Sequence, residues 1–194
     1  MSPEDWTERG DWLEGHMFDR RIVSLRGALD DVTATRVASQ LMTLDATGDD
    51  VVQLQLDCPG GSLEAGFAVV DVIDALGVPV QVTCLGRVEG SAALVAAVCG
   101  RRLAMEHTRF RLTDPDAAFE ARASQVESLV EYHRRSYLRY HERLALATGR
   151  PLEMITAACE GGRYMSATEA VAFGLVDEIV RSQRAPVRAL PGLR

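Results

Sequence analysis

The chain has 194 residues, of which 47 % are hydrophobic and 25 % are charged, a composition typical of one globular domain with a sizeable core. Its formal net charge is −7 and its pI is near 5.1. This acidic balance, without a clustered run of basic residues, argues against a nucleic-acid partner, because phosphate binding requires concentrated positive charge.

The beginning of the sequence is acidic and polar, so it does not resemble a secretory signal. No apolar run approaches the roughly 18 to 20 residues that are needed to cross a bilayer. We therefore expect a cytoplasmic protein without a membrane partner.

The numbers of cysteine and lysine residues exclude several kinds of metal site and catalytic site. The four cysteines, Cys58, Cys84, Cys99 and Cys159, lack paired spacing and are expected to be reduced, mostly buried thiols, so no metal or other cofactor is expected. All 21 basic Lys or Arg positions are arginine. Since a guanidinium group does not deprotonate near neutral pH, a lysine-type base, a Schiff base and a Walker nucleotide site are excluded within this chain.

Strand and helix patterns alternate along the first half of the chain. The predicted strands are 21–25, 51–57 and 78–85, and the predicted helices are 29–44, 62–76 and 91–98, with further strand structure within 101–112. Strands that alternate with helices form βαβ units. The expected fold class is therefore α/β, with a largely parallel sheet covered by helices.

A long helix is predicted in the second half, at 123–147, and it ends before the glycine and proline of a turn. Shorter elements follow, namely helices at 152–158 and 166–173 and a strand within 175–180. No linker divides the chain. We expect an N-terminal segment at 1–17, one domain at 18–181 and a flexible tail at 182–194.

Several motifs occur in a fixed order and share the spacing of a known family. They are FDRRIVSLRGALDDVTA from Phe18, CPGG from Cys58, CLGRVEGSAALVAAVCG from Cys84, TGRPLEMI from Thr148 and YMSATEAVAFGLVDEIV from Tyr164. From about Phe18 to Val180, the chain resembles the proteolytic subunit of the Clp protease. The resemblance implies a ClpP/crotonase-like fold with a protruding helical handle, and assembly into seven-membered rings that stack face to face.

The same resemblance assigns positions to the family's Ser-His-Asp triad. The serine position is occupied by Gly90, the histidine position, in RFRLTDP, by Thr113, and the acid position by Ala158. Gly60 and Gly61 match residues whose backbone N–H groups help to form the family's oxyanion hole. Because serine hydrolysis requires a hydroxyl and an imidazole base, we expect a catalytically inactive subunit with an assembly or regulatory role.

Two other functions stay open at this stage. A weak hydrolase could use Ser91, although we interpret this serine as the N-cap of the following helix. A crotonase-like binder of acyl thioesters could use the same oxyanion geometry. Cys58 is a weaker candidate nucleophile, because no imidazole is expected beside it.

The four histidines offer little support for a relocated base. His16 is near the terminus, and His107 precedes Thr113 by six residues. His133 and His141 are predicted to lie at the surface of the long helix. None of them is therefore expected to activate Ser91.

Two further departures bear on partners and substrates. The glycine-rich substrate strand of the family is replaced by helix-favouring residues at 116–124, and the axial loop that contacts an AAA+ unfoldase is absent or changed. Self-association into heptameric or double rings, or a hetero-oligomer with active Clp proteolytic subunits, is expected. An AAA+ unfoldase is a further candidate partner, although the changed N-terminal sequence argues against direct gating by it.

Overall fold

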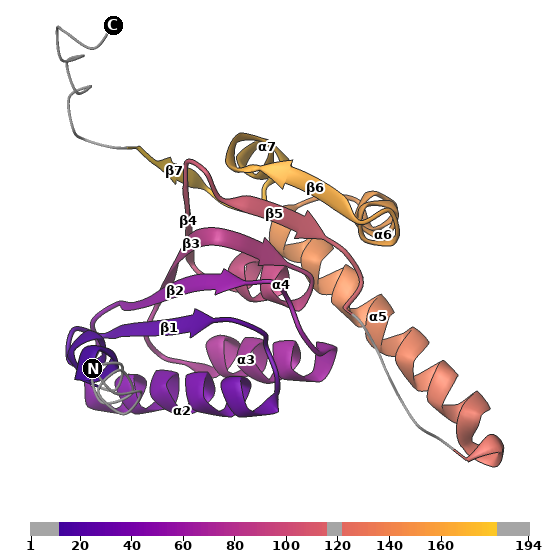
Figure 1. The fold of residues 1–194 in the computed structure, drawn as a ribbon, viewed down its shortest axis with the longest axis horizontal. Coiled ribbons are helices and arrows are strands. Elements are labelled where there is room, and N and C mark those ends of the chain that lie inside the picture. The colour runs from indigo at the N-terminus through magenta and orange to yellow at the C-terminus, as the bar shows by residue number, and fades with distance from the viewer. Residues whose placement is uncertain (1–11, 116–121, 182–194) are drawn as a thin grey trace, which may run out of the picture.

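A computed structural model describes residues 12–115 and 122–181. Most of the predicted N-terminal segment, the predicted flexible tail and most of the altered substrate strand lie outside the described residues. The described part is a mixed α/β fold with a mostly parallel sheet, as predicted (Figure 1).

The strands are β1 (Ile22–Arg26), β2 (Val52–Cys58), β3 (Val80–Glu89), β4 (Arg101–Met105), β5 (Arg109–Leu112), β6 (Arg163–Ser166) and β7 (Glu178–Val180). The helices are α2 (Asp31–Thr47), α3 (Leu63–Ala75), α4 (Ser91–Val98), α5 (Val126–Thr148), α6 (Leu152–Glu160) and α7 (Ala167–Phe173). A short helix covers residues 12–18, and a 3-10 turn at Ala123–Gln125 leads into α5.

The central sheet has the order β1-β2-β3-β4-β7, and its neighbouring strands run parallel. Helices α2, α3 and α4 lie along one face of this sheet (Figure 1). Side-chain oxygens cap two of these helices, with Asp30 accepting from the Thr33 N–H and Ser62 accepting from the Ala65 N–H. The βαβ pattern in the sequence therefore predicted this half of the fold correctly.

Strand β3 changes its partner halfway along, and this change positions the candidate site. Its first half pairs with β4, whereas Arg87 to Glu89 pair with β5. Gly86 lies between the halves with φ +50°, where a Cβ would be only 2.7 Å from the Asp57 carboxylate. The same carboxylate accepts a hydrogen bond from the Arg87 N–H at 3.1 Å. A glycine is thus required where the strand leaves β4.

Helix α5 projects from the body as the predicted handle (Figure 1). Its buried residues all lie from the middle of the helix onward, namely Ser136, Tyr140, His141 and Leu144. The helix ends at Gly149, which adopts the left-handed conformation with φ +67°. None of the helices in the described ranges is both long and apolar enough to cross a membrane.

The second half of the sheet differs from the sequence prediction. The region 101–112 forms two strands separated by a turn, and β6 pairs antiparallel with β5 although no strand was predicted there. The sequence of β6, RYMS, has only four residues and directly precedes the cap of α7. Its strand conformation depends on pairing with β5, which a local pattern does not encode.

Arg102 on β4 joins four segments of the fold. Its guanidinium donates to the carbonyls of Ala147 at 3.1 Å and Gly174 at 2.9 Å, and to the Asp177 carboxylate, with Nε 3.0 Å from Oδ1. Burial of this side chain makes these charge-assisted hydrogen bonds stronger than exposed ones. The end of α5, the end of α7 and the segment before β7 are therefore fastened to the central sheet.

Candidate functional site

Gly90 forms a sharp turn between β3 and α4. Its backbone has φ +52° and ψ −126°, a conformation that costs little only for glycine. The Gly90 N–H donates to the Arg111 carbonyl at 3.1 Å, and its carbonyl accepts from the Ala93 N–H at 2.9 Å. Such a strained strand-to-helix turn is the backbone setting that exposes a nucleophile in α/β hydrolases.

The predicted serine and histidine positions face each other. A Cβ at Gly90 would lie 3.7 Å from Cγ2 of Thr113 and 3.9 Å from Cα of Gly60. The fold therefore brings Gly60, Gly90 and Thr113 together. Thr113 presents a methyl group there, while its hydroxyl contacts the Asp114 carbonyl at 3.4 Å. None of these three residues therefore has a side chain that could act as a base.

Gly60 and Gly61 form a tight turn against the segment that precedes α2. The Leu29 N–H donates to the Gly60 carbonyl at 2.9 Å, and the Ser62 N–H donates to the Leu29 carbonyl at 3.0 Å. A Cβ at Gly61 would lie 2.0 Å from the Leu29 carbonyl oxygen, and Gly60 has φ +95°. Packing alone thus requires both glycines, and their use as oxyanion donors stays a prediction.

The interpretation of Ser91 as the helix cap is wrong. Gly90 occupies the cap position of α4, and Ser91 is the first residue of the helix. The Ser91 hydroxyl is fully buried and has no hydrogen-bond partner among the described residues. Its Cβ would be 2.8 Å from a Cβ at Gly66, so it packs closely against α3. The sharp turn at Gly90 moves the cap position one residue earlier.

The prediction that His141 lies at the surface is also wrong. Its side chain is buried between α5 and α6, because the second half of α5 packs onto the body. Its Nε2 lies 2.7 Å from Oδ1 of Asp114, and its Nδ1 lies 3.3 Å from the Thr156 hydroxyl. His133 is partly buried on the same helix, and His107 is exposed in the turn at the opposite end of β5 from Thr113.

Helix α5 holds the segment Thr113–Pro115 through three side chains. The Tyr137 hydroxyl donates to the Pro115 carbonyl at 2.9 Å, and the Tyr140 hydroxyl lies 2.9 Å from the Gly90 carbonyl and 3.3 Å from the Thr113 carbonyl. The third contact is the hydrogen bond between His141 and Asp114. Burial raises the pKa of Tyr140 well above its ordinary value, so the phenol remains a donor.

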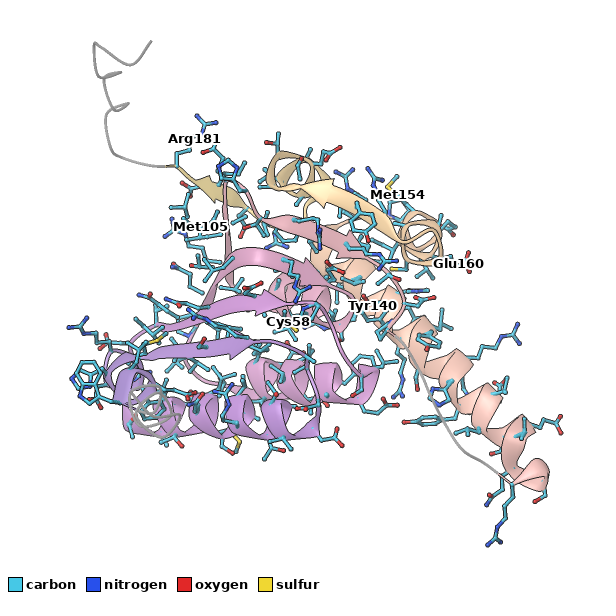
Figure 2. All side chains as sticks on the ribbon, viewed as in Figure 1. Cys58, Met105, Tyr140, Met154, Glu160 and Arg181 are labelled. Carbon is cyan, nitrogen blue, oxygen red and sulfur yellow. The ribbon has the colours of Figure 1, made fainter. Side chains whose placement is uncertain are left out.

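Cys58 at the end of β2 and Tyr140 on α5 both lie near the middle of the molecule (Figure 2). All four cysteines are free and buried, as predicted. Burial raises the pKa of Cys58 to about 11, and its thiol contacts the Gly60 carbonyl at 3.4 Å. A thiol with this pKa is protonated at neutral pH, which weighs against Cys58 as a substitute nucleophile.

The predicted acid position, Ala158, lies on α6, where its methyl group is buried. The next residue, Cys159, has its sulfur within 4.8 Å of ligand atoms of Asp114 and His141. Burial, assisted by the negative charge of Asp114, raises the pKa of Cys159 to about 12. This group of side chains was missed by the sequence reasoning, because its members come from three separate segments.

The comparisons with known proteins agree with the motifs. Residues 7–183 match the family model described as Clp protease. The chain is 34 % identical over 180 residues to the ATP-dependent Clp protease proteolytic subunit 3 of Rhizobium etli, which covers 90 % of this chain and 91 % of that relative. The chain therefore belongs to the Clp protease family.

Proposed function

We propose that this protein is a catalytically inactive subunit of a Clp-type protease complex, in which it has an assembly or regulatory role. The proposal rests mainly on the turn at Gly90. This residue occupies the family's nucleophile position, and a Cβ placed there would lie 3.7 Å from the Cγ2 methyl group of Thr113, which occupies the base position. The turn and the surrounding fold are retained, but the nucleophile position has no side-chain hydroxyl and the base position has no imidazole. A scaffold in this state can assemble but lacks the groups for acyl transfer.

The alternative nucleophile, Ser91, has poor support. Its hydroxyl is fully buried, and among the described residues it has no hydrogen-bond partner that could act as a base. A serine nucleophile requires such a partner to remove its proton. The contact with Gly66 accounts for a small side chain at this position through packing alone.

The first test is reaction with a fluorophosphonate probe and turnover of a fluorogenic peptide. Loss of the nucleophile or the base in a serine protease lowers turnover by on the order of a millionfold, so we expect no labelling and only background hydrolysis. Ser91→Ala should behave as the wild type in both assays and should unfold at the same or a higher temperature, because the lost hydroxyl is buried and unpaired.

A family member with a complete triad serves as the positive control for both assays. Labelling of the native wild type that disappears in Ser91→Ala would contradict the proposal. Peptide turnover well above background that Ser91→Ala abolishes would lead to the same conclusion.

The assembly role is supported by the apolar surface of the handle. Helix α5 projects from the body, and it exposes Val126, Val130 and Leu138 by 42 to 52 %. Large apolar side chains on a protruding helix are characteristic of contacts with other protein chains. We therefore propose that α5 takes part in a ring of identical chains or in a mixed ring with active Clp subunits, in the cytoplasm.

Native mass spectrometry after co-expression with the active Clp subunits of the same organism tests this assembly. We expect a seven-membered or stacked ring that contains this chain, and we expect Val130→Glu to dissociate it because a charge would be buried in the contact. Val32→Glu, the same exchange at a 78 % exposed site on α2, is the matched control. A monomer under all conditions, or a ring unaffected by Val130→Glu, would refute the handle contact.

A further inference from the structure

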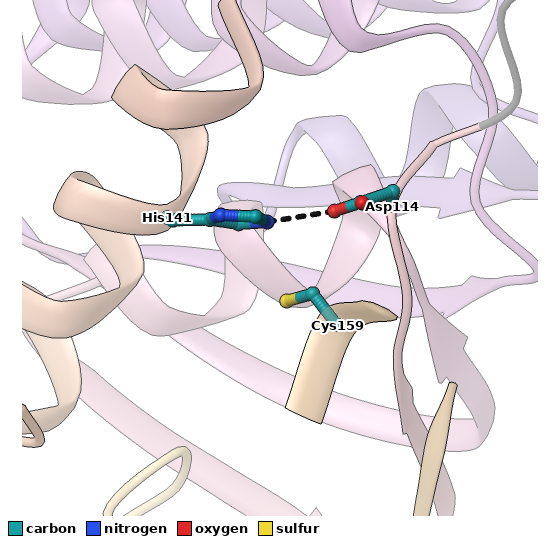
Figure 3. A group of neighbouring side chains, drawn as sticks. All are labelled: Asp114, His141 and Cys159. Atoms are coloured by element: carbon teal, nitrogen blue, oxygen red, sulfur yellow. Dashed lines mark hydrogen bonds and ion pairs between the residues drawn. The ribbon is translucent and has the colours of Figure 1, made fainter. Parts of the chain in front are cut away.

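Three potential metal ligands meet beside the candidate site. Asp114 follows β5, His141 lies on α5 and Cys159 lies on α6, and their ligand atoms are all within 4.8 Å of one another. Figure 3 shows the Asp114 carboxylate and the His141 ring pointing toward each other, with the Cys159 sulfur beside them. His141 and Cys159 are buried, whereas Asp114 is partly exposed.

The spacing is close to that of a metal centre. Zinc binds sulfur at about 2.3 Å and imidazole nitrogen or carboxylate oxygen at about 2.1 Å, so tetrahedral geometry places the ligand atoms roughly 3.3 to 3.6 Å apart. Here the nitrogen of His141 and the oxygen of Asp114 are separated by 2.7 Å, and no separation in the group exceeds 4.8 Å. Side-chain shifts on the order of 1 Å would therefore complete the geometry.

The surroundings also orient the imidazole. Nε2 of His141 faces the carboxylate, while Nδ1 lies 3.3 Å from the Thr156 hydroxyl one turn before Cys159 on α6. A ligating histidine usually bonds its second ring nitrogen to a fixed polar group, which sets the tautomer and the ring direction. Thr156 is placed to perform this task if Nε2 binds a metal ion.

We propose that Asp114, His141 and Cys159 bind a divalent transition-metal ion, and the mixed sulfur, nitrogen and oxygen donor set matches zinc best. Magnesium and calcium prefer sets composed of oxygen ligands alone. On binding, the Cys159 thiol loses its proton to solvent and its thiolate bonds the metal. The His141 ring proton that Nε2 donates to Asp114 moves through solvent to Nδ1, which then donates to the Thr156 hydroxyl, and the freed Nε2 lone pair bonds the ion. Three protein ligands leave a fourth position for water.

The ion would crosslink the segment after β5, helix α5 and helix α6. Asp114 and Cys159 directly follow Thr113 and Ala158, the predicted base and acid positions, and His141 lies on the handle helix. The bound metal therefore links the segment after β5 and α6 to α5. This proposal does not depend on the protein being an inactive subunit, because it concerns ligand chemistry and not peptide turnover.

Cobalt titration of the full-length, chelator-treated protein tests the site. We expect one Co²⁺ per chain, a thiolate-to-cobalt charge-transfer band in the near ultraviolet, visible bands of a tetrahedral ion, and displacement of cobalt by Zn²⁺. Zn²⁺ should also raise the unfolding temperature, since it binds the folded state preferentially. A wild-type protein that binds no cobalt, or that binds it without the charge-transfer band, would overturn the proposal.

Matched variants assign the ligands. Cys159→Ser should abolish the charge-transfer band, and His141→Gln and Asp114→Asn should each weaken cobalt binding by at least about tenfold. The controls are Cys99→Ser, another buried cysteine, and His133→Gln, on the same helix, and both should bind as the wild type. Circular dichroism checks folding of every variant.

The variants at the buried residues His141 and Cys159 could fail to fold. Asp114→Asn should fold in any case, because the exchange is nearly isosteric and Asp114 is partly exposed, so it tests the site independently. Unchanged cobalt binding in folded Asp114→Asn or Cys159→Ser would show that the Asp114–His141 contact is only a structural hydrogen bond. Loss of binding in the Cys99 or His133 control would equally refute the assignment.

Discussion

Gly90→Ser, Thr113→His and Ala158→Asp, introduced together, should create serine hydrolase activity in this chain. The turn at Gly90 already has the required backbone, and a side chain there points at residue 113. A serine held in the positive-φ conformation of Gly90 costs about 1 to 3 kcal/mol, which a folded domain tolerates. We expect peptide turnover at least ~10²-fold above that of Gly90→Ser alone, the lower end of what a positioned acid–base group contributes.

The measurement is the initial rate with a fluorogenic peptide, together with fluorophosphonate labelling mapped by mass spectrometry. The double variant Thr113→His/Ala158→Asp, which retains Gly90, is the matched control and should stay at background. Equal activity above background in the double and the triple variant would show that the nucleophile is not residue 90, and its abolition by Ser91→Ala would identify Ser91. A folded and assembled triple variant without activity would mean that these three positions do not form a triad.

Arg102→Met should destabilise the folded protein strongly, because the Arg102 guanidinium joins four segments of the fold. The variant leaves the carbonyls of Ala147 and Gly174 and the carboxylate of Asp177 without their common donor. Loss of a partly buried, charged hydrogen-bond centre costs about 3 kcal/mol of unfolding free energy. Arg101→Met is the matched control, since its pair with Glu178 is exposed, and it should cost less than about 0.5 kcal/mol.

The effect of Arg102 also depends on pH. Its hydrogen bonds, followed by its charge, lower the pKa of Asp177 in the folded protein. A carboxyl with a lowered folded-state pKa contributes stability above its ordinary pKa, and this contribution is lost as the pH falls through the lowered value. Urea unfolding of the wild type and Arg102→Met should therefore converge in part as the pH falls below about 4. A constant difference from pH 7 to pH 3 would contradict this account.

Sequence patterns predicted most of the central sheet, because each of its strands and helices is encoded by the spacing of apolar residues within its own segment. Alternating apolar residues in β2 are buried, and the helix from Ser91 to Val98 begins and ends where the pattern does. The motifs also placed Gly90 and Thr113 at positions that the fold brings together, although they are 23 positions apart in the sequence. Strand β6 was missed because its structure requires pairing with β5.

The candidate site contains features that a local pattern cannot reveal. His141 lies on a charged helix and was predicted to be exposed, but α6 and the segment after β5 cover it. The cap prediction for Ser91 followed the residue preference at helix starts and failed because the turn at Gly90 already ends the strand. The His141 error concerns which segments meet in three dimensions, the Ser91 error concerns the backbone turn before the helix, and neither concerns the type of element.

The three contacts from α5 to the segment Thr113–Pro115 have a consequence for recognition. Tyr137, Tyr140 and His141 fix this segment from one helix, so its backbone beside Gly90 is ordered before anything binds. Binding costs less when the receptor loses little conformational entropy. A ligand that docks beside Gly90 would therefore meet a pre-organised surface, and its affinity would depend mainly on how much freedom the ligand itself gives up.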